Sequence, residues 1–305
     1  MDIPAGTLAP NQLYSASISR FRVTDIDRNS QANAYFIAAN AVETRFTINT
    51  GAASDDPVQI GAIGLEVYYL QTGPGAPVLD LQDDEQFGAL AILLGESVHE
   101  LTSASVTIPG GTVFPLEYEA EDNEFAAFQT HASFDAMVAD VPAGDYTLRY
   151  QIAGGAQVEN TVTADEAFPG VPHVTKCAGT QSVDASEDFT ITWDPIENMT
   201  GTDGIAVYVD DPMGGGDLFA REVYLIDPSG LRGTAQSVTI PAGLLEPGQT
   251  YEVTLDALKF GEIDESNEGQ IFVAFNMRST GFNLVTTSGN QAPSITTEGL
   301  DSALE

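Results

Sequence analysis

The chain has 305 residues, a length that allows two or three domains. It carries 45 acidic and 10 basic residues, and the resulting net charge of −35 excludes binding to nucleic-acid phosphates and attraction to an anionic membrane. The chain is still 43% hydrophobic, so it can bury sizeable cores. No apolar run is long enough for membrane insertion, and residues 1–4 lack the start of a secretory signal peptide.

The predicted elements are almost all strands, because apolar and polar residues alternate in short runs bounded by Gly, Pro and Asp. The first segment, residues 1–72, holds a strand over 14–18. Its Ala-rich run, 32–42, fits a turn or two of helix, but its similarity to 270–275 favours a strand.

The second segment, residues 73–165, opens with a Pro/Gly linker and carries 16 acidic residues and one basic residue. We expect a β-sandwich of unassigned family with strands at 90–94, 103–108, 125–129 and 146–152. The wider apolar run, 87–94, fits either a buried strand or a short helix.

The third segment, residues 166–290, also opens at a Pro/Gly turn, and strands are predicted at 189–193, 205–209 and 251–255. A polar tail, residues 291–305, follows it. The predicted fold class is therefore all-β, with tandem Ig-like sandwiches.

A repeat links the two ends of the chain. At an offset of 237, residues near the N-terminus recur near the C-terminus: Ile3, Pro4, Ala5, Gly6, Leu8, Pro10, Gln12, Tyr14 and Asp27 match Ile240, Pro241, Ala242, Gly243, Leu245, Pro247, Gln249, Tyr251 and Asp264. After a one-residue deletion, Phe36, Ala38, Asn40, Thr44, Phe46 and Thr50 match Phe272, Ala274, Asn276, Thr280, Phe282 and Thr286. So many matches over about 48 positions indicate a true internal repeat.

The run from Leu245 to Leu255, with Pro247 and Tyr251, resembles the sixth strand of fibronectin type III modules. The run ending at Trp193 resembles the second strand of that family, with its core tryptophan. The resemblance implies a complete module at 166–290, a tyrosine corner at Tyr251 and a core shared by Trp193 and Tyr251. The loop expected between Leu258 and Phe272 is longer than is usual for that family.

Residues 3–50 match only the second half of such a module and lack the strand that carries tryptophan. A hairpin has little stability alone in water. We therefore expect residues 1–72 to be the C-terminal half of a module plus a connecting strand. The chain is then excised from a longer array, or this half packs on another surface.

The sequence contains no recognisable catalytic motif, and we expect no enzyme activity. Cys177 is the only cysteine and is expected to be a buried strand residue. The three histidines, His99, His131 and His173, are expected at the surface or in turns. The acidic runs, including the one over 117–124, are expected to form a solvated face.

Calcium is the one cofactor for which the sequence offers candidate ligands. Asp25, Asp27 and Asn29 place two carboxylates and an amide at alternate positions, which suits a hard cation. The segment departs from an EF-hand loop, because Ser30 replaces the glycine and Phe36 occupies the position of the bidentate glutamate. A hydrogen-bonded acidic turn is the alternative.

Two further acidic groups are candidates for the same role. The repeat copy has Glu262, Asp264 and Asn267, and another loop is flanked by Asp210, Asp211 and Asp217.

The sequence favours a non-catalytic segment of a larger secreted or cell-surface protein, acting as a spacer or as an adhesive or binding region. Its expected partners are other modules of the same polypeptide, and a polysaccharide or another surface protein. The alternative is a carbohydrate-binding accessory module of a polysaccharide-degrading enzyme. The adjacent pair Tyr68 and Tyr69 offers one exposed aromatic side chain for that alternative.

Overall fold

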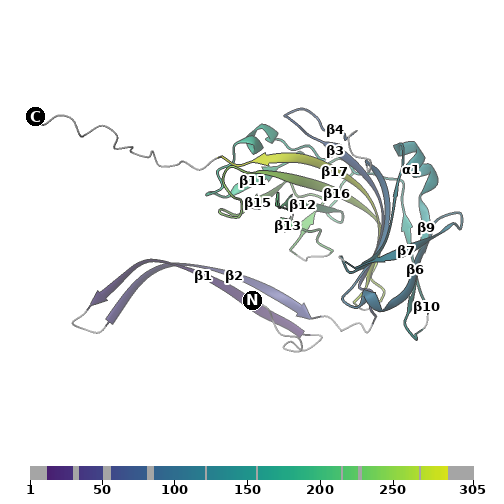
Figure 1. Cartoon of the computed structure of the whole chain (residues 1–305), viewed down its shortest axis with the longest axis horizontal. Coiled ribbons are helices and arrows are strands. Elements are labelled where there is room, and N and C mark those ends of the chain that lie inside the picture. Colours follow the sequence, from purple (N-terminus) through teal and green to yellow (C-terminus); the bar gives the residue numbers. More distant parts are fainter. Residues whose placement is uncertain are drawn as a thin grey trace, which may run out of the picture. The chain divides into compact units, whose positions relative to one another are not determined.

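The computed structural model describes residues 12–29, 34–50, 56–80, 86–120, 122–155, 157–213, 216–225, 229–267 and 269–287 (Figure 1). Side chains are described from residue 56 onward. The chain divides into two compact units, residues 1–56 with 265–270, and residues 57–264 with 271–305. Among the described residues, no helix is long and apolar enough to cross a membrane.

The N-terminal unit holds a two-stranded antiparallel sheet of β1 (Gln12–Asn29) and β2 (Ala34–Thr50). Gln12 pairs with Thr50 at one end and Asn29 with Ala34 at the other, and a bulge interrupts the register between Val23 and Asp25. The preference for a strand in the Ala-rich run is confirmed over its described part, 34–42.

The larger unit is an all-β fold, as predicted, with short helical turns between strands. Its strands are β3 (Ile60–Leu70), β4 (Val78–Leu79), β5 (Phe87–Leu94), β6 (Leu101–Thr107), β7 (Val113–Glu119), β8 (Glu124–Thr130), β9 (Gly144–Ile152), β10 (Gln157–Ala164), β11 (Phe189–Thr192), β12 (Gly204–Asp210), β13 (Asp217–Arg221), β14 (Leu231–Arg232), β15 (Ser237–Ile240), β16 (Thr250–Asp264) and β17 (Ile271–Val285). The described helices are α1 (Phe134–Asp140) and two 3-10 turns, η1 (Val98–Glu100) and η2 (Cys177–Gln181). The ambiguous run 87–94 is strand β5.

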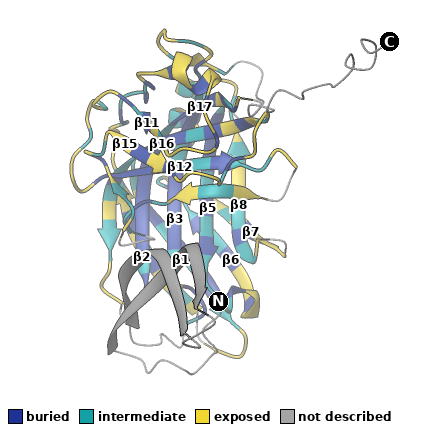
Figure 2. Ribbon diagram, turned by 90° about the vertical axis from the view of Figure 1, so that its left-hand side faces the viewer, coloured by how far each residue is buried: buried dark blue, intermediate teal, exposed yellow. Residues whose placement is uncertain are grey.

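One large sheet passes through the whole larger unit in the order β10-β9-β6-β7-β8-β5-β3-β17-β16-β12-β13, and β11 and β15 form a separate two-stranded sheet. Neighbours in the large sheet are antiparallel except β3 and β17, which run parallel from Ile60 beside Ile271 to Leu70 beside Gly281. Figure 2 shows buried and intermediate residues along the long strands and exposed residues in the connecting turns.

The large sheet folds over itself and over the small sheet to enclose two cores. The first core packs β6, β9 and β10 against β3, β5, β8 and the first half of β17. The second core packs β11 and β15 against β12, β16 and the second half of β17. Both halves of the unit are therefore β-sandwiches, and β17 belongs to both.

The even-numbered residues of the shared strand β17 point to one face of the sheet. Phe272 and Ala274 are buried in the first core, and Phe282 and Leu284 are buried in the second. Between them, the amide of Asn276 donates hydrogen bonds to the carbonyls of Asp165 and Ala167, both at 3.0 Å. Thr280 donates to the carbonyl of Pro172 at 2.8 Å. Side chains on this face of β17 thus bind the linker between the two sandwiches.

The predicted pairing of Trp193 and Tyr251 in one core is confirmed. Trp193 is 3% exposed, and its indole nitrogen donates to the carbonyl of Ala235 at 2.8 Å. The hydroxyl of Tyr251 accepts a hydrogen bond from the backbone nitrogen of Glu246 at 2.6 Å, which is the tyrosine corner that the resemblance implied. The expected long loop is wrong: β16 and β17 extend through most of it, and the polar turn is confined to 265–270.

The boundaries predicted at residues 72 and 165 remain a proposal. The structure joins the segments on either side of them, because β3 lies between β17 and β5 in the large sheet. At the end of β3, Gln71 is 2% exposed and binds the backbone of Val174 on both sides, accepting from its nitrogen at 2.8 Å and donating to its oxygen at 3.0 Å. The described residues of 57–264 and 271–287 therefore form one continuous architecture.

Candidate functional site

The predicted calcium ligands Asp25, Asp27 and Asn29 lie on strand β1, opposite Ala38, Phe36 and Ala34 of β2. The prediction placed them in a loop, and the structure places them in a paired strand. Their side chains lie outside the described part of the chain, so calcium at these residues stays a prediction.

The repeat copy of this segment has a structural contact. Glu262, which occupies the position of Asp25 in the repeat, accepts a hydrogen bond from the backbone nitrogen of Thr163 at 2.9 Å. Next to it, Gly261 brings β16 against β10, since a Cβ at residue 261 would lie 2.7 Å from the carbonyl oxygen of Thr163. The hydrogen bond of Glu262 therefore connects β16 to β10.

The hairpin of β12 and β13 brings Asp210 opposite Asp217. The pKa of Asp210 is raised, first by burial and then by hydrogen bonding to Asp217 and the negative charges of Asp217 and Glu252. Asp211 turns to the loop instead, where its carboxylate accepts from the backbone nitrogen of Met213 at 2.8 Å. Of the three carboxylates that flank this loop, the structure thus brings two together.

A second acidic group gathers at the turn between β7 and β8. The carboxylate oxygens of Glu119, Asp122 and Glu124 all lie within 4.8 Å of one another. Burial raises the pKa of Glu124, and the charges of Asp122 and Glu119 raise it further. Oxygen ligands of this kind suit a hard divalent cation, and the exposure of Glu119 and Asp122 equally suits the solvated acidic face that the sequence predicts.

The turn that gathers these carboxylates depends on Asn123, which has a left-handed backbone with φ of 53°. Its side chain accepts from the hydroxyl of Tyr118 at 3.1 Å and donates to the carbonyl of Gly95 at 3.1 Å. The sequence signal is an Asn between two acidic residues, directly before a strand that begins with Glu. The acidic run is visible in the sequence but its convergence is not, and Glu121 of that run lies outside the described residues.

Asp256 is a buried carboxylate on β16, 8% exposed and opposite Ser279 of β17. Burial raises the pKa of Asp256 to about 7; the Ser279 hydroxyl acts to lower it and the charge of Glu222 to raise it. Glu222 itself accepts a hydrogen bond from the hydroxyl of Tyr208 at 2.8 Å. One oxygen of Asp256, Oδ1, has no hydrogen-bond partner among the described residues. This polar patch on the sheet was not predicted from the sequence.

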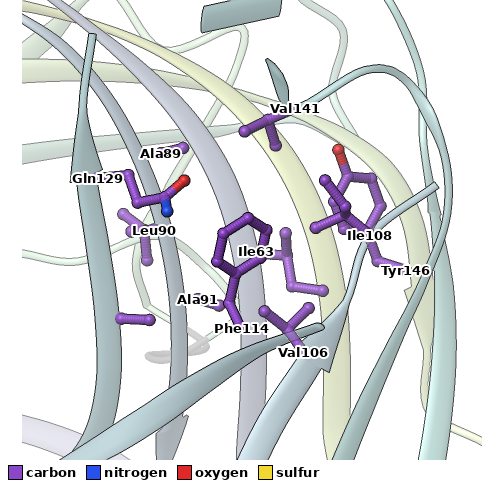
Figure 3. Close-up of a pocket in the computed structure, with 11 residues that line it drawn as sticks. Ile63, Ala89, Leu90, Ala91, Val106, Ile108, Phe114, Gln129, Val141 and Tyr146 are labelled. Carbon is purple, nitrogen blue, oxygen red and sulfur yellow. The ribbon is translucent and has the colours of Figure 1, made fainter. Parts of the chain in front are cut away.

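Two cavities of the described part lie against the large sheet and are lined mainly by apolar side chains. Figure 3 shows one of about 30 Å³ in the first core, between Ile63 on β3, Phe114 on β7 and Tyr146 on β9. Its polar groups are few, and the Tyr146 hydroxyl is already used, since it donates to the carbonyl of Pro142 at 2.6 Å. Burial raises the pKa of Tyr146 to about 12. A larger cavity of about 140 Å³ on the other face of the sheet is lined by apolar side chains of β3, β5, β16 and β17.

In the described region, Cys177, His131 and His173 make contacts within the fold. Cys177 lies in the 3-10 turn η2 and not in a strand as predicted, and its burial raises the pKa of the thiol. His131, expected at the surface or in a turn, directly follows strand β8; its side chain is 6% exposed, and its Nε2 lies 3.7 Å from a carboxylate oxygen of Asp140. His173 Nδ1 lies 2.7 Å from a carboxylate oxygen of Asp194.

The aromatic pair Tyr68 and Tyr69 is half-buried on β3. Tyr69 packs against the small core around Val67, and the hydroxyl of Tyr68 donates to Glu66 at 2.9 Å. The exposed aromatic side chains of the described region are Tyr118, 41% exposed, and Phe128, 43% exposed. These two point to opposite faces of the sheet, because Tyr118 lies opposite Phe125 and Phe128 lies three residues further along β8.

Comparison with known proteins gives no match to a family model and none to a curated protein. Among solved structures, the chain is similar to domains FN1–FN3 of chicken CNTN1, with 10% identity over 94% of this chain and 84% of that one and a TM-score of 0.26. It is similar to a Ca²⁺-stabilised adhesin with which an Antarctic bacterium binds ice (10% identity, 90% of this chain, 56% of that one, TM-score 0.21). It is also similar to a tetra-tandem repeat in the extending region of a large adhesion protein (12% identity, 91% and 68% of the two chains, TM-score 0.20). Such scores carry no residue assignments to this chain.

Proposed function

We propose that this chain is a non-catalytic spacer segment of a larger secreted or cell-surface protein, built from fibronectin type III-like sandwiches. One observation carries the proposal: strand β17 contributes side chains to both cores, so residues 57–285 cannot be pulled apart at a linker without breaking a sheet. A segment built in this way keeps a fixed length between the parts that flank it.

The linker between the sandwiches supports the same role. In a string of independent modules, a Pro/Gly linker lets neighbours reorient. Here Gln71 binds Val174, and Asn276 and Thr280 bind the carbonyls of residues 165, 167 and 172. Five hydrogen bonds to backbone groups therefore fix the linker against β3 and β17.

Pulling single molecules by their ends tests the spacer role. Unfolding of residues 57–285 as one unit would release about 800 Å of chain in one step, at about 3.4 Å per residue. Independent sandwiches would give two steps of about 300 and 400 Å. The double variant Asn276→Leu with Thr280→Val removes the hold on the linker and should lower the unfolding force. A first step of about 400 Å, in which the second sandwich unfolds while the first stays folded, would contradict the proposal.

The adhesive part of the proposal concerns a surface protein or polysaccharide as partner, and the acidic surface suits a partner that is basic or bound through divalent cations. A carbohydrate platform has less support, because Tyr68 and Tyr69 are half-buried and the exposed aromatics face opposite ways. Affinity electrophoresis in soluble polysaccharides tests this alternative. Retardation that is lost in Tyr68→Ala and kept in Phe128→Ala would favour carbohydrate binding.

A further inference from the structure

The N-terminal hairpin repeats the β16–β17 hairpin in its register as well as in its sequence. The residue pairs that match are Tyr14 with Ile48 and Tyr251 with Leu284; Ile26 with Ile37 and Ile263 with Val273; and Asp27 with Phe36 and Asp264 with Phe272. Each hairpin has its bulge in the same place, after Val23 in one and after Phe260 in the other. Another equivalent pair of positions places a serine opposite an acidic residue in both hairpins: Ser19 is opposite Glu43, and Asp256 is opposite Ser279.

The residues that the repeat keeps on β17 and just after it bind groups outside that strand. Phe272 and Ala274 pack in the first core, and Phe282 packs in the second. Asn276 and Thr280 bind carbonyls of the linker. Thr286 donates to the carbonyl of Glu246 at 2.6 Å. These side chains complete the cores of two neighbouring sandwiches and bind the linker between them. The pairing of the hairpin strands with each other does not require them.

The hairpin β1–β2 has the same residue types at the same register positions, from Phe36 to Thr50, although among the described strands it forms a sheet of only two. In the second copy, both outer edges are occupied. β12 pairs with β16 over Val253 to Leu258, and β3 pairs with β17 over Ile271 to Gly281. The equivalent edges of the hairpin are residues 16–21 of β1 and 35–45 of β2.

We propose that β1–β2 is the closing hairpin of a further sandwich pair, a copy of residues 57–239 that precedes residue 3 in the same polypeptide. Strands like β12 and β3 pair with residues 16–21 and 35–45. Asn40 and Thr44 occupy the repeat positions of Asn276 and Thr280, which bind the linker within residues 165–172. This inference rests only on the part of the proposed function that makes the chain a series of tandem modules. It defines the repeating unit as the stretch from one strand like β3 to the next closing hairpin.

A second copy of this chain is a poorer partner for the hairpin. Its β12 and β3 are already paired with its own β16 and β17. The partner must be a unit that has no closing hairpin other than β1–β2, and a unit placed directly before it satisfies that requirement.

The test adds the missing unit to the full chain. Residues 57–239 are fused ahead of residue 3, so that Thr239 precedes Ile3 as it precedes Ile240. Hydrogen exchange is then compared between the fused chain and the 305-residue chain. We expect the outward amides within 16–21 and 35–45 to exchange at least 100-fold more slowly in the fused chain. The tryptophan of the added copy should give the near-UV signal of a packed core.

A matched variant separates specific closure from general protection. Asn40→Leu with Thr44→Val in the fused chain should speed exchange in the added linker and leave residues 165–172 unchanged. An added copy that stays unfolded, or that folds while residues 16–21 and 35–45 exchange as before, would overturn the inference. So would concentration-dependent protection of the same residues in the 305-residue chain, because the partner would then be a second molecule. None of these readouts involves adhesion or mechanical force.

Discussion

The two sandwiches of the larger unit use the same local device but differ in how complete they are. In each, a tyrosine near the start of a central strand bonds to the turn before it, Tyr146 to Pro142 and Tyr251 to Glu246. The second core is built entirely from residues 174–284. The first core takes Val58 and Ile63 from before its own segment, and Phe272 and Ala274 from the far end of the chain. The first sandwich therefore depends on its neighbour, and the second does not.

The largest expected effect follows from this asymmetry. A fragment of residues 166–287 should fold, with the near-UV circular dichroism of a buried Trp193, because every residue of the second core is present. A fragment of residues 73–165 should remain unfolded, because it lacks β3 and β17, which cover one side of its core. A folded 73–165 fragment with dispersed NMR signals would contradict the dependence.

Two phenylalanines on β17 test the sharing of this strand. Phe272 and Phe282 are 1% and 2% exposed in the first and second cores. Phe→Ala at either position should cost about 3–5 kcal/mol of unfolding free energy, measured by chemical denaturation. Local hydrogen exchange should distinguish them, with β6 and β9 opening first in Phe272→Ala, and β11 and β15 in Phe282→Ala. Identical exchange patterns in both variants would show that the two cores do not behave as distinct parts.

A substitution of Gln71 tests the hydrogen bonds that connect the two sandwiches. Gln71→Ala leaves the buried nitrogen and oxygen of Val174 without their partner, and we expect a loss of about 2–4 kcal/mol. Gln157→Ala, at an exposed position on β10, is the matched control and should change stability by less than about 0.5 kcal/mol. Equal effects of the two substitutions in a thermal melt would remove Gln71 from the linker argument.

Local patterns made the strands and the second core predictable. Alternation placed 205–209 and 251–255 in strands, and the turn before Tyr251 with Trp193 upstream indicated which residues share a core. The parallel pairing of β3 with β17 joins residues 211 positions apart, such as Ile60 and Ile271, and no local pattern encodes that choice. Nothing in the local sequence marks Gln71, because only the tertiary fold brings Val174 beside it. The convergence of Glu119, Asp122 and Glu124 likewise depends on the left-handed backbone of Asn123.

A substitution of Asp256 tests the polar patch on the sheet face that points away from the second core. Its pKa in the folded state is about 7, above the ordinary value of 3.8. Between these values the folded state holds more protons than the unfolded state, so the unfolding free energy falls as the pH rises from about 4 to about 7. The loss is on the order of 2–4 kcal/mol. Asp256→Asn should flatten this dependence and raise the melting temperature more at pH 8 than at pH 4. A slope that is unchanged in the variant would assign it to other groups.

The smallest effect expected is that of salt on the two acidic sandwiches. Residues 73–165 carry 16 acidic residues and one basic residue, and residues 166–305 carry 22 and five. Repulsion among like charges weakens the compact state, and salt screens it, with a Debye length of about 3 Å in molar salt. We expect the melting temperature to rise by a few degrees between dilute and molar NaCl. Because charge per residue is higher in the first sandwich, exchange in β6 to β9 should slow more than in β11 to β15. Equal slowing in both would mean that salt acts on the shared sheet as a whole, and an unchanged melting temperature would show that repulsion contributes little.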